Sequence, residues 1–574
     1  MTLVCVPILV ETVDAALADA RAARDAGADL VEFRFDAFFT GEGFHTGSPE
    51  SHAEFDAALH LVAESPLPCI ATCRPVLEGG HYEGTDSARL ALFQRLGVGP
   101  DTPSGPRTPP HRPPRFLDVE LATYSRSESV KGQLDLAVDH PAQQRDVASS
   151  LILSFHDFHS RPPDLIRRLE RMYTEPACRV VKVAYRARSL RDNLELLDIL
   201  AANRAGEGGG KPIIALAMGP FGLMSRVLAP KFGAFLTFAS LRRESATAPG
   251  QPVISDLLSL YRFRSIGPST RVYGVVGWPV EHSLSPHVHN AGFEAAGHDG
   301  VYLPLPIPPE YEHFKATVLA LIDHPHLDLC GLSVTMPHKE HLVRLAREEW
   351  DAGDGRWCLD ALSTRCRAAN TLTIERDPSG AAARLAVANT DGPAAADLLD
   401  GCRRVVILGA GGTARAVATE LLHRGTHVTI ANRTLARAEA LAQDLAHATS
   451  LPPPEVIPLD APPSRDADAV ANCTSLGLKT PDEPDTQSAA SPVPAEWLAG
   501  LRGVRVALDC VYAHAETPFL NHAARAGVPE AGRLGGLSLF VRQAAAQFES
   551  WTRAPAPRAL FAKVAEEALA SHRS

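Results

Sequence analysis

The sequence lacks any uninterrupted apolar run close to the roughly 18 residues that a membrane-spanning helix requires. It also lacks an excess of positive charge, because 67 acidic residues outnumber 56 basic ones and the formal net charge is −11. We therefore expect no membrane and no nucleic acid as a partner, while a locally basic pocket for a small anion stays open. The sequence gives no indication of the oligomeric state.

The ten cysteines are scattered and form no C-x-x-C pair. Most of them, such as Cys5, Cys69 and Cys330, lie in apolar runs, where we expect small buried hydrophobic residues. We predict no metal site. No basic or Ser/Arg-rich leader precedes the apolar run that starts at Leu3, so we expect a cytoplasmic location.

Residues 1–262 alternate short apolar runs with helix-like stretches. Helix-period segments include Val13–Ala26, Pro163–Tyr173 and Leu190–Ala202. The predicted strands are Leu3–Val10, Leu30–Arg34, Pro68–Arg74, Arg115–Leu121, Leu151–Phe155, Val180–Ala184, Pro212–Met218 and Ala234–Phe238. Eight strands with crossover helices in about 250 residues predict a (β/α)8 barrel. The Pro- and Gly-rich segment Gly97–Pro114 is expected to be a surface loop.

Charged and polar residues gather at the ends of the predicted strands, where (β/α)8 enzymes place their active sites. They are Glu32, Arg34, Arg74, Glu120, His156 and Asp157. Lys182 lies within a run that otherwise predicts a buried strand. A neutral lysine amine attacks a ketone to form an imine, which then acts as an electron sink. Other cations nearby in a desolvated interior would reduce the roughly 4–5 kcal/mol needed to keep that amine neutral near pH 7.

His156 titrates near neutrality and is a candidate for proton transfer beside that lysine. Each of these residues also has a structural interpretation when taken alone. Lys182 would be an edge lysine with a solvated tip, His156 a structural histidine, and the arginines surface charges. Together with Arg226, they indicate a pocket for an anionic, hydroxylated substrate.

Seven segments carry a specific resemblance. They are Val31–Asp36, Thr72–Pro75, Ser154–Asp157, Val181–Ala184, Ala217–Gly219, Ser225–Arg226 and Thr247–Gln251. They resemble type I 3-dehydroquinate dehydratase, in the family's order, over essentially all of residues 1–262. The resemblance implies that Lys182 forms the Schiff base, that His156 is the general acid and base, and that Glu78 orients this histidine.

The same resemblance implies that the substrate is contacted by Glu32, Arg34, Arg74, Arg226, Thr247 and Gln251. Thr247 stands where the family commonly has serine, and it keeps the hydroxyl. The implied reaction is the dehydration of 3-dehydroquinate to 3-dehydroshikimate, without a cofactor.

A second α/β region is predicted after a short linker at Arg264–Thr270, with strands at Val272–Val276, Cys402–Leu408 and His427–Ile430. The turn Gly409-Ala410-Gly411-Gly412-Thr413-Ala414 follows one strand and precedes an Ala-rich helix. Such glycines let the backbone approach a pyrophosphate at a helix N-terminus, although similar turns also arise for packing.

The next strand leads into Asn432-Arg433-Thr434, with Arg437 one turn later. An acidic residue there would bind a free ribose 2′-hydroxyl, whereas arginine suits a 2′-phosphate. NADP is therefore favoured over NAD. The alternative is that Arg433 is an ordinary surface residue at a helix start.

Polar residues also surround this block. Ser283 and Ser285 precede a helix with Pro286 in its first turn, and they would hold a small anion or cap the helix. Lys339 follows a strand, and Pro337 is expected at the first position of the next helix. Asp391 follows another strand. A lysine and an aspartate would provide proton transfer at a reacting hydroxyl.

These segments resemble shikimate dehydrogenase over most of residues 271–552. The resemblance implies that Lys339 and Asp391 are the catalytic pair and that Ser283 and Ser285 bind the substrate carboxylate. It implies substrate contacts for Thr335, Asn370, Tyr512 and Gln543. It implies NADP contacts for Gly409, Ala410, Gly411, Gly412, Thr413, Ala414, Asn432, Arg433, Thr434, Arg437 and Gly535. The chain departs from the family at Arg365–Ala369 and at Arg542.

We expect three regions: a barrel over 1–262, a substrate-binding lobe over 271–394 that helices within 537–574 complete, and a Rossmann-type NADP-binding lobe over 395–536. The product of the first reaction is the substrate of the second, so a bifunctional enzyme of aromatic amino acid biosynthesis is predicted, with small molecules as its partners. The alternatives are a catabolic quinate/shikimate dehydrogenase fusion and a ligand-sensing regulator without chemistry. Lys182, His156, Lys339 and Asp391 are all retained, which argues against the regulator.

Overall fold

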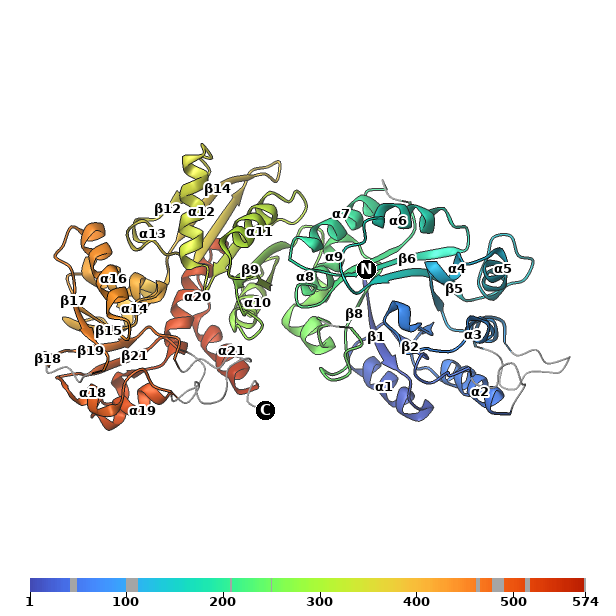
Figure 1. The fold of residues 1–574 in the computed structure, drawn as a ribbon, viewed down its shortest axis with the longest axis horizontal. Coiled ribbons are helices and arrows are strands. Elements are labelled where there is room, and N and C mark those ends of the chain that lie inside the picture. The colour runs from blue at the N-terminus through green and yellow to red at the C-terminus, as the bar shows by residue number, and fades with distance from the viewer. Residues whose placement is uncertain are drawn as a thin grey trace. The chain divides into compact units, whose positions relative to one another are not determined.

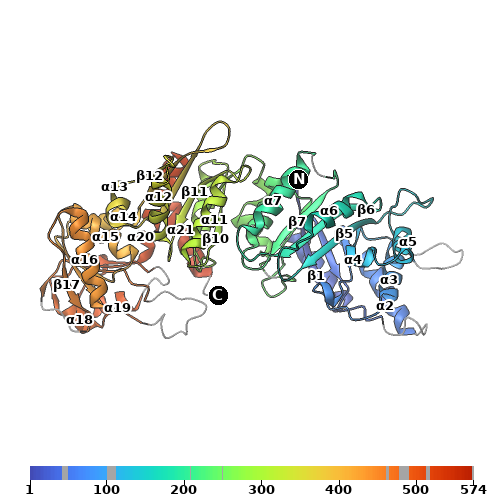
Figure 2. The same cartoon turned by 45° about the horizontal axis from the view of Figure 1, so that its top comes forward.

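The computed structural model describes residues 1–41, 49–99, 112–206, 209–248, 250–460, 465–476, 490–511 and 517–571. The chain divides into two compact units, Met1–Thr270 and Arg271–Ser574. Both are built from alternating strands and helices (Figures 1 and 2). No helix within the described ranges is long and apolar enough to cross a bilayer.

The first unit is a parallel eight-stranded barrel. Its strands are β1 (Leu3–Leu9), β2 (Leu30–Arg34), β3 (Cys69–Thr72), β4 (Phe116–Glu120), β5 (Ser150–Asp157), β6 (Cys178–Arg186), β7 (Ile213–Met218) and β8 (Leu236–Phe238). They run in the order β7-β6-β5-β4-β3-β2-β1-β8. The barrel closes where the Phe235 amide donates to the Ile213 carbonyl at 2.8 Å. The predicted fold of this half is confirmed, with all eight strands in place.

Helices connect the strands of the barrel. They are α1 (Val13–Asp25), α2 (Pro49–Ala63), α3 (Asp86–Val98), α4 (Leu121–Tyr124), α5 (Glu128–Ala137), α6 (Leu165–Thr174), α7 (Asp192–Arg204), α8 (Leu223–Val227) and α9 (Ala229–Phe232). The expected loop at Gly97–Pro114 is wrong at its start, because Gly97 and Val98 end α3. A Cβ on Gly97 would lie 2.0 Å from the Ala137 carbonyl oxygen, so this glycine permits the close packing of α3 on α5. Residues 100–111 lie outside the described ranges.

The barrel interior has an apolar layer and a polar layer. Leu30, Ile70, Phe116, Ile152 and Val180 belong to one buried apolar cluster. Side chains two positions apart on a strand share a face. The residues two positions further along these strands therefore also point inward, nearer the carboxyl ends. They are Glu32, Thr72, Asp118, Ser154 and Lys182. The polar layer thus lies above the apolar layer, toward the carboxyl ends of the strands, where barrel enzymes bind their substrates.

The second unit contains two six-stranded sheets. The first has the order β10-β9-β11-β13-β14-β12, with β13 antiparallel to both of its neighbours. Its strands are β9 (Arg271–Gly277), β10 (Gly300–Pro306), β11 (Leu329–Val334), β12 (Trp357–Leu359), β13 (Thr371–Arg376) and β14 (Ala382–Ala388). Its helices are α10 (Ser285–Ala295), α11 (Tyr311–Asp323), α12 (Lys339–Asp351) and α13 (Ala361–Cys366).

Two details of this region differ from the sequence predictions. Helix α12 begins at Lys339 with His338 as its N-cap, so Pro337 lies before the helix and not at its first position. Cys330 is only partly buried on β11. The last helices of the chain, α20 (Gly536–Thr552) and α21 (Arg558–Ser571), share a core with the first sheet, in which Phe548, Trp551 and Phe561 pack with Tyr273 and Phe293.

The second sheet is fully parallel, in the order β17-β16-β15-β19-β21-β22. This is the doubly wound Rossmann order, counted from β15 as the first strand. The strands are β15 (Arg404–Leu408), β16 (His427–Asn432), β17 (Glu455–Pro458), β19 (Ala469–Asn472), β21 (Val506–Asp509) and β22 (Arg533–Leu534). A short separate pair joins β18 (Arg465–Asp466) to β20 (Leu501–Arg502).

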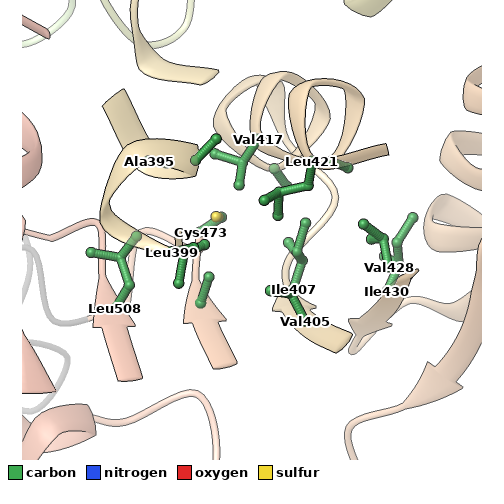
Figure 3. Close-up of a cluster of buried hydrophobic side chains, with 14 of the residues drawn as sticks. Ala395, Leu399, Val405, Ile407, Val417, Leu421, Val428, Ile430, Cys473 and Leu508 are labelled. Carbon is green, nitrogen blue, oxygen red and sulfur yellow. The ribbon is translucent and has the colours of Figure 1, made fainter. Parts of the chain in front are cut away.

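Helices α14 (Asp391–Leu398), α15 (Gly412–His423), α16 (Leu435–Thr449), α18 (Ala495–Ala499) and α19 (Pro518–Arg525) accompany this sheet. Figure 3 shows Val417 and Leu421 of α15 facing Val405 and Ile407 of β15. The core they form with Leu508 fixes α15 above the sheet and holds its first turn at the carboxyl end of β15.

Candidate active sites

Lys182 projects from β6 into the polar layer of the barrel, and its side chain is 6% exposed. Its Nζ lies 2.7 Å from Asp118 Oδ2 and 3.5 Å from Glu32 Oε1. The solvated edge lysine is therefore excluded. The groups that contact Nζ directly are carboxylates, and a neighbouring cation is Arg74, whose Nη2 lies 2.8 Å from the other oxygen of Asp118.

Asp118 and Ser154 are two site residues that the sequence analysis missed. Asp118 stands two positions before Glu120 on β4, so the strand turns both carboxylates inward. Burial alone would raise the pKa of Asp118, but the charges of Arg74 and Lys182 hold it well below its usual range. Its Oδ1 accepts from Ser154 Oγ at 2.6 Å. A charged residue inside an apolar strand was the signal that singled out Lys182, and it applies equally to Asp118.

Arg74 is held by this carboxylate group. Its Nη1 donates to Glu120 Oε1 at 2.7 Å and to Ser154 Oγ at 2.9 Å, and its Nη2 lies 2.8 Å from Asp118 Oδ1. Arg89 on α3 is also buried and donates to the other oxygen of Glu120 at 2.5 Å. Arg74 is thus committed to internal partners, and its charge offsets those of the carboxylates around Lys182.

His156 and Glu78 form a pair at the end of β5. The ring Nδ1 and the backbone amide of His156 each lie 3.2 Å from Glu78 Oε2. Burial and the charge of Glu120 raise the pKa of Glu78 to about 7. Burial and the cations Arg74 and Lys182 lower the pKa of His156 well below its usual value, so the imidazole is neutral at pH 7.

The strand register brings His156 and Lys182 onto one face. Ser154 pairs with Lys182 and His156 pairs with Ala184 across β5 and β6. His156 therefore lies two positions nearer the rim than the partner of Lys182, on the same side of the sheet. A substrate carbonyl at the lysine would have its neighbouring carbon on the side of the imidazole.

Arg226 and Gln251 present buried polar atoms without partners. Arg226 on α8 is 1% exposed, and its Nε and Nη2 have no hydrogen-bond partner within the described residues. Burial lowers its pKa to about 10. Gln251 Oε1 accepts from the Thr247 amide at 3.1 Å, while its buried Nε2 is unpartnered in the same described set. A buried unpaired cation is costly, so this corner is built for an anion.

Arg34 differs from Arg226, since it donates to both oxygens of Asp36 at 2.7 and 2.9 Å. Glu32 accepts from Thr72 Oγ1 at 2.7 Å. Both predicted site residues of β2 lie beside the polar layer, but each already has a protein partner.

In the second unit, Lys339 is the centre of a second polar group. Its Nζ lies 2.6 Å from Asp391 Oδ2 and 3.1 Å from Thr413 Oγ1. Asn370 Nδ2 lies 2.9 Å from Asp391 Oδ1 and 3.3 Å from Gln543 Oε1. The structure thus brings together four predicted site residues and the threonine of the glycine turn.

Supporting contacts fix the Asp391 end of this group. Asn389 Oδ1 accepts from the amides of Asp391 and Gly392, which start α14. Gln547, which the sequence analysis missed, donates to the Asn370 carbonyl at 2.9 Å and accepts from Ser333 Oγ at 2.7 Å. Its position on a helical face shared with Gln543 is the signal that would have identified it.

Ser283 and Ser285 stand at the start of α10, where the Ser285 amide donates to Ser283 Oγ at 3.3 Å. Thr335 follows β11, and its methyl lies 2.3 Å from where a Cβ on Gly277 would be. These three residues follow the carboxyl ends of β9 and β11, which are parallel neighbours. Tyr512 lies outside the described residues.

The glycine turn after β15 leaves room for a ligand. Gly409 has φ +108°, and a Cβ there would come within 3.2 Å of the Cys473 backbone. Gly411 is the N-cap of α15, and a Cβ on it would meet nothing within 4 Å. Thr413 and Ala414 continue the first turn of α15, so amides of this turn and the helix N-terminus face the same space.

Two cations lie beyond the next strand. Arg433 and Arg437 are exposed around the start of α16 and form no ion pair with any described carboxylate. Asn432 Nδ2 donates to the Thr434 carbonyl at 2.8 Å and shapes this turn, and Gly535 is the N-cap of α20. A helix N-terminus with two unpaired arginines at the neighbouring strand end fits a dinucleotide that carries a 2′-phosphate.

Family models match both units. The type I 3-dehydroquinase family matches residues 4–268, the shikimate dehydrogenase substrate binding domain matches 275–354, and the shikimate / quinate 5-dehydrogenase family matches 395–458. A bifunctional 3-dehydroquinate dehydratase/shikimate dehydrogenase of Arabidopsis thaliana, described as chloroplastic, is 31% identical over 98% of this chain and 83% of its own length. The chain belongs to this bifunctional family.

Other relatives match the second unit or the whole chain. The NADP-dependent shikimate dehydrogenase of Methanocella arvoryzae is 36% identical over 52% of this chain and 99% of its own length. The solved shikimate 5-dehydrogenase of Thermus thermophilus with NADP(H) and shikimate is 28% identical over 52% of this chain, with a TM-score of 0.41. The solved dehydroquinate dehydratase and shikimate dehydrogenase portion of an S. pombe protein covers 98% of both chains at 23% identity and a TM-score of 0.39.

Proposed function

We propose that the chain catalyses two consecutive reactions of the shikimate pathway. The barrel dehydrates 3-dehydroquinate to 3-dehydroshikimate, and the second unit reduces 3-dehydroshikimate to shikimate with NADPH. The observation that carries the proposal is the presence of two lysine centres: buried Lys182 with Asp118 and the nearby His156, and partly buried Lys339 with Asp391. The Arabidopsis thaliana relative that matches nearly the whole chain is named for both activities.

In the barrel, Arg226 and Gln251 bind the substrate carboxylate through their unpartnered atoms. Asp118, 2.7 Å from Lys182, orients the amine, which must lose a proton before it reacts. The amine then attacks the ketone and water leaves as the imine forms. Neutral His156 takes the proton from the carbon next to the imine and returns it to the hydroxyl that departs as water. Hydrolysis of the imine releases the product and restores Lys182.

The remaining predicted contacts complete this site. Glu32, Arg34 and Arg74 face substrate hydroxyls while keeping the internal partners described above, and Thr247 holds Gln251 in place. Glu78 orients His156 and stabilises its protonated form. No step of this sequence requires a cofactor.

In the second unit, Ser283, Ser285 and Thr335 bind the substrate, together with Asn370, Gln543 and Tyr512. Bound NADPH supplies the hydride that reduces the ketone. Lys339 donates the proton that the resulting oxygen requires, and Asp391, which Asn370 holds, orients the lysine side chain. The residues that hold the dinucleotide are the turn from Gly409 to Ala414, Asn432, Arg433, Thr434, Arg437 and Gly535.

We assign residues 1–262 to the dehydratase, 271–394 with 537–574 to substrate binding, and 395–536 to NADP binding. The core that α20 and α21 share with the first sheet supports the discontinuous assignment. We keep a cytoplasmic location as our proposal, although the plant relative is described as chloroplastic.

A coupled assay tests both halves. Adding 3-dehydroquinate and NADPH to the purified chain is expected to consume NADPH, with much slower consumption of NADH. Lys182→Ala should abolish this signal and leave reduction of supplied 3-dehydroshikimate intact. Lys211→Ala, which removes a partly buried lysine bound to carbonyls elsewhere in the barrel, is the matched control. Loss of both activities in Lys182→Ala would contradict the division of labour.

Covalent trapping tests the imine. Borohydride added during turnover of 3-dehydroquinate should leave a reduced adduct on Lys182, located by peptide mass. An unmodified Lys182 under these conditions would overturn the Schiff-base assignment.

The 2′-phosphate assignment has its own test. Arg433→Ser combined with Arg437→Ser should raise the KM for NADPH by about tenfold or more and leave the KM for NADH nearly unchanged. Equal changes for both cofactors would mean that these arginines do not read the 2′-phosphate. Quinate supplied with NAD tests the catabolic alternative in the same assay.

A further inference from the structure

Two cysteines with adjacent sulfurs lie at the edge of the proposed dinucleotide site. Cys473 directly follows β19 and Cys510 directly follows β21, and their Sγ atoms are 3.6 Å apart. All ten cysteines fall within the described residues and all are free. In that set, no other pair of sulfurs lies within hydrogen-bonding distance.

The strands hold the two cysteines in a geometry that a disulfide accepts. Asn472 pairs with Asp509 in the parallel ladder, Asn472 Nδ2 donates to Asp509 Oδ1 at 2.9 Å, and the Cys510 amide donates to the Asn472 carbonyl at 2.9 Å. Neighbouring strands lie about 4.8 Å apart, within the Cα separation of roughly 4.4–6.8 Å that disulfides span. To form a bond of about 2.05 Å, the sulfurs must close their 3.6 Å separation, and the strand ends that carry them must move with them.

Cys473 lies beside the glycine turn of the proposed reduction site. The Cys473 backbone is the atom group nearest to a Cβ placed on Gly409, the first glycine of the turn. Figure 3 shows the Cys473 sulfur near Leu399. The hydrogen bond with Cys473, burial, and the charges of Asp509 and Asp391 together raise the pKa of Cys510. Cys473 therefore lies beside the glycine turn, and Cys510 is joined to it by the contact between their sulfurs.

We propose that Cys473 and Cys510 form a reversible disulfide that switches the reduction site off while leaving the barrel active. The expected loss of reduction rests on the proposed reductase function, whereas the formation of the disulfide does not. Joining the sulfurs draws together the ends of β19 and β21 beneath Gly409. This displaces the backbone on which the glycine turn rests, so dinucleotide binding weakens.

The chemistry is thiol–disulfide exchange with a low-molecular-weight disulfide such as oxidised glutathione. One cysteine thiolate attacks a sulfur of that disulfide and expels one thiol, and the second cysteine then displaces the other. The two cysteine protons end on the two released thiols, and the two electrons reduce the oxidant. Cys510, which is only partly buried, is the point of access. Its raised pKa makes the exchange faster as the pH rises.

The test uses the full chain incubated with oxidised glutathione. Peptide mapping without reduction should show the peptides carrying Cys473 and Cys510 joined, with the loss of two hydrogen atoms. In the same sample, reduction of 3-dehydroshikimate should fall by more than about tenfold while dehydration of 3-dehydroquinate is unchanged, and dithiothreitol should restore it. Peptide mapping does not depend on enzyme activity. Absence of the joined peptides would therefore contradict the disulfide without bearing on the proposed reductase function.

Variants separate the pair from general oxidation. Cys510→Ser and Cys473→Ala should each abolish both the joined peptides and the loss of reduction, and the matched control Cys358→Ser, a partly buried cysteine on β12, should behave like the parent chain. The proposal is overturned if no joined peptide forms, if oxidation stops at a mixed disulfide, or if the joined chain reduces its substrate at the normal rate.

Discussion

Arg226 shows most directly how a single residue can serve binding at the cost of stability. Its guanidinium is 1% exposed, yet two of its nitrogens have no partner in the described residues. An uncompensated buried charge is normally avoided in a core. The presence of Arg226 in this core is explained if binding of an anionic group recovers the free energy that burial of its charge costs.

The first prediction follows from this residue. Arg226→Met keeps an unbranched apolar stem and removes the charge, so the barrel should become more stable, by about 1 kcal/mol or more. The same variant should lose roughly 100-fold or more in kcat/KM for 3-dehydroquinate, because the two unpartnered guanidinium nitrogens that would bind the carboxylate are removed. Thermal unfolding and steady-state kinetics on one preparation measure both effects. A variant that lost stability along with activity would argue for a structural role.

The second prediction concerns Glu78. Its pKa is raised to about 7, so it loses its proton as the pH rises through 7. The carboxylate then stabilises the protonated imidazole 3.2 Å away and makes His156 a stronger base. We expect kcat/KM for dehydration to rise with pH through this range. Glu78→Gln should lower the activity and flatten that rise, whereas Glu83→Gln, at an exposed position nearby, should keep the parent profile.

At the level of elements, the strands and the glycine turn were predictable because their signals are local. Apolar runs of strand length and the spacing of Gly409, Gly411 and Gly412 depend on a few adjacent residues. The partners of Lys182 were not predictable in the same way. They depend on which strands are neighbours and in what register, since Asp118 reaches the amine from a strand two positions away in the barrel.

Helix boundaries were also hard to predict, because they depend on contacts that the local sequence does not reveal. Pro337 was expected in the first turn of a helix, but the hydrogen bond from the His338 amide to the Thr335 carbonyl forms a turn first, and the helix starts at Lys339. Gly97 looked like the start of a loop because glycine is common there. It is helical because close packing against Ala137 requires a residue without a side chain.

The third prediction tests a contact between elements. A Cβ on Gly331 of β11 would lie 2.4 Å from the Trp551 indole nitrogen, which donates to the Leu372 carbonyl at 3.2 Å. The indole cannot retreat without losing that bond. Gly331→Ala should therefore destabilise the second unit by about 1–3 kcal/mol. Gly355→Ala, where nothing lies within 4 Å of the added carbon, is the control and should change the unfolding midpoint little.

At the level of the whole molecule, the chain is divided into units with separate cores. The barrel uses residues up to Thr270, and the second unit uses the rest. Each proposed site is built entirely from one unit, since the contacts of Lys182 lie below residue 270 and those of Lys339 lie above it.

The fourth prediction follows from this division. Calorimetry of the full chain should resolve two unfolding transitions. NADP at about 100 times its dissociation constant should stabilise one of them by roughly 2.7 kcal/mol and leave the other in place. The borohydride-trapped adduct on Lys182 should shift the unfolding transition that NADP leaves in place, which is that of the barrel. A single transition that moved with either ligand would show that the units unfold together.

The amide of Asn370 joins segments that are far apart in the sequence, because its neighbours include Asp391 and Gln543. During synthesis, the ribosome completes the barrel long before it adds Gln543. A nascent chain can thus hold a finished dehydratase while Asn370, which binds the aspartate of the reductase, still lacks its contact with Gln543. The order of translation therefore repeats the order of the two reactions, and the reductase matures last.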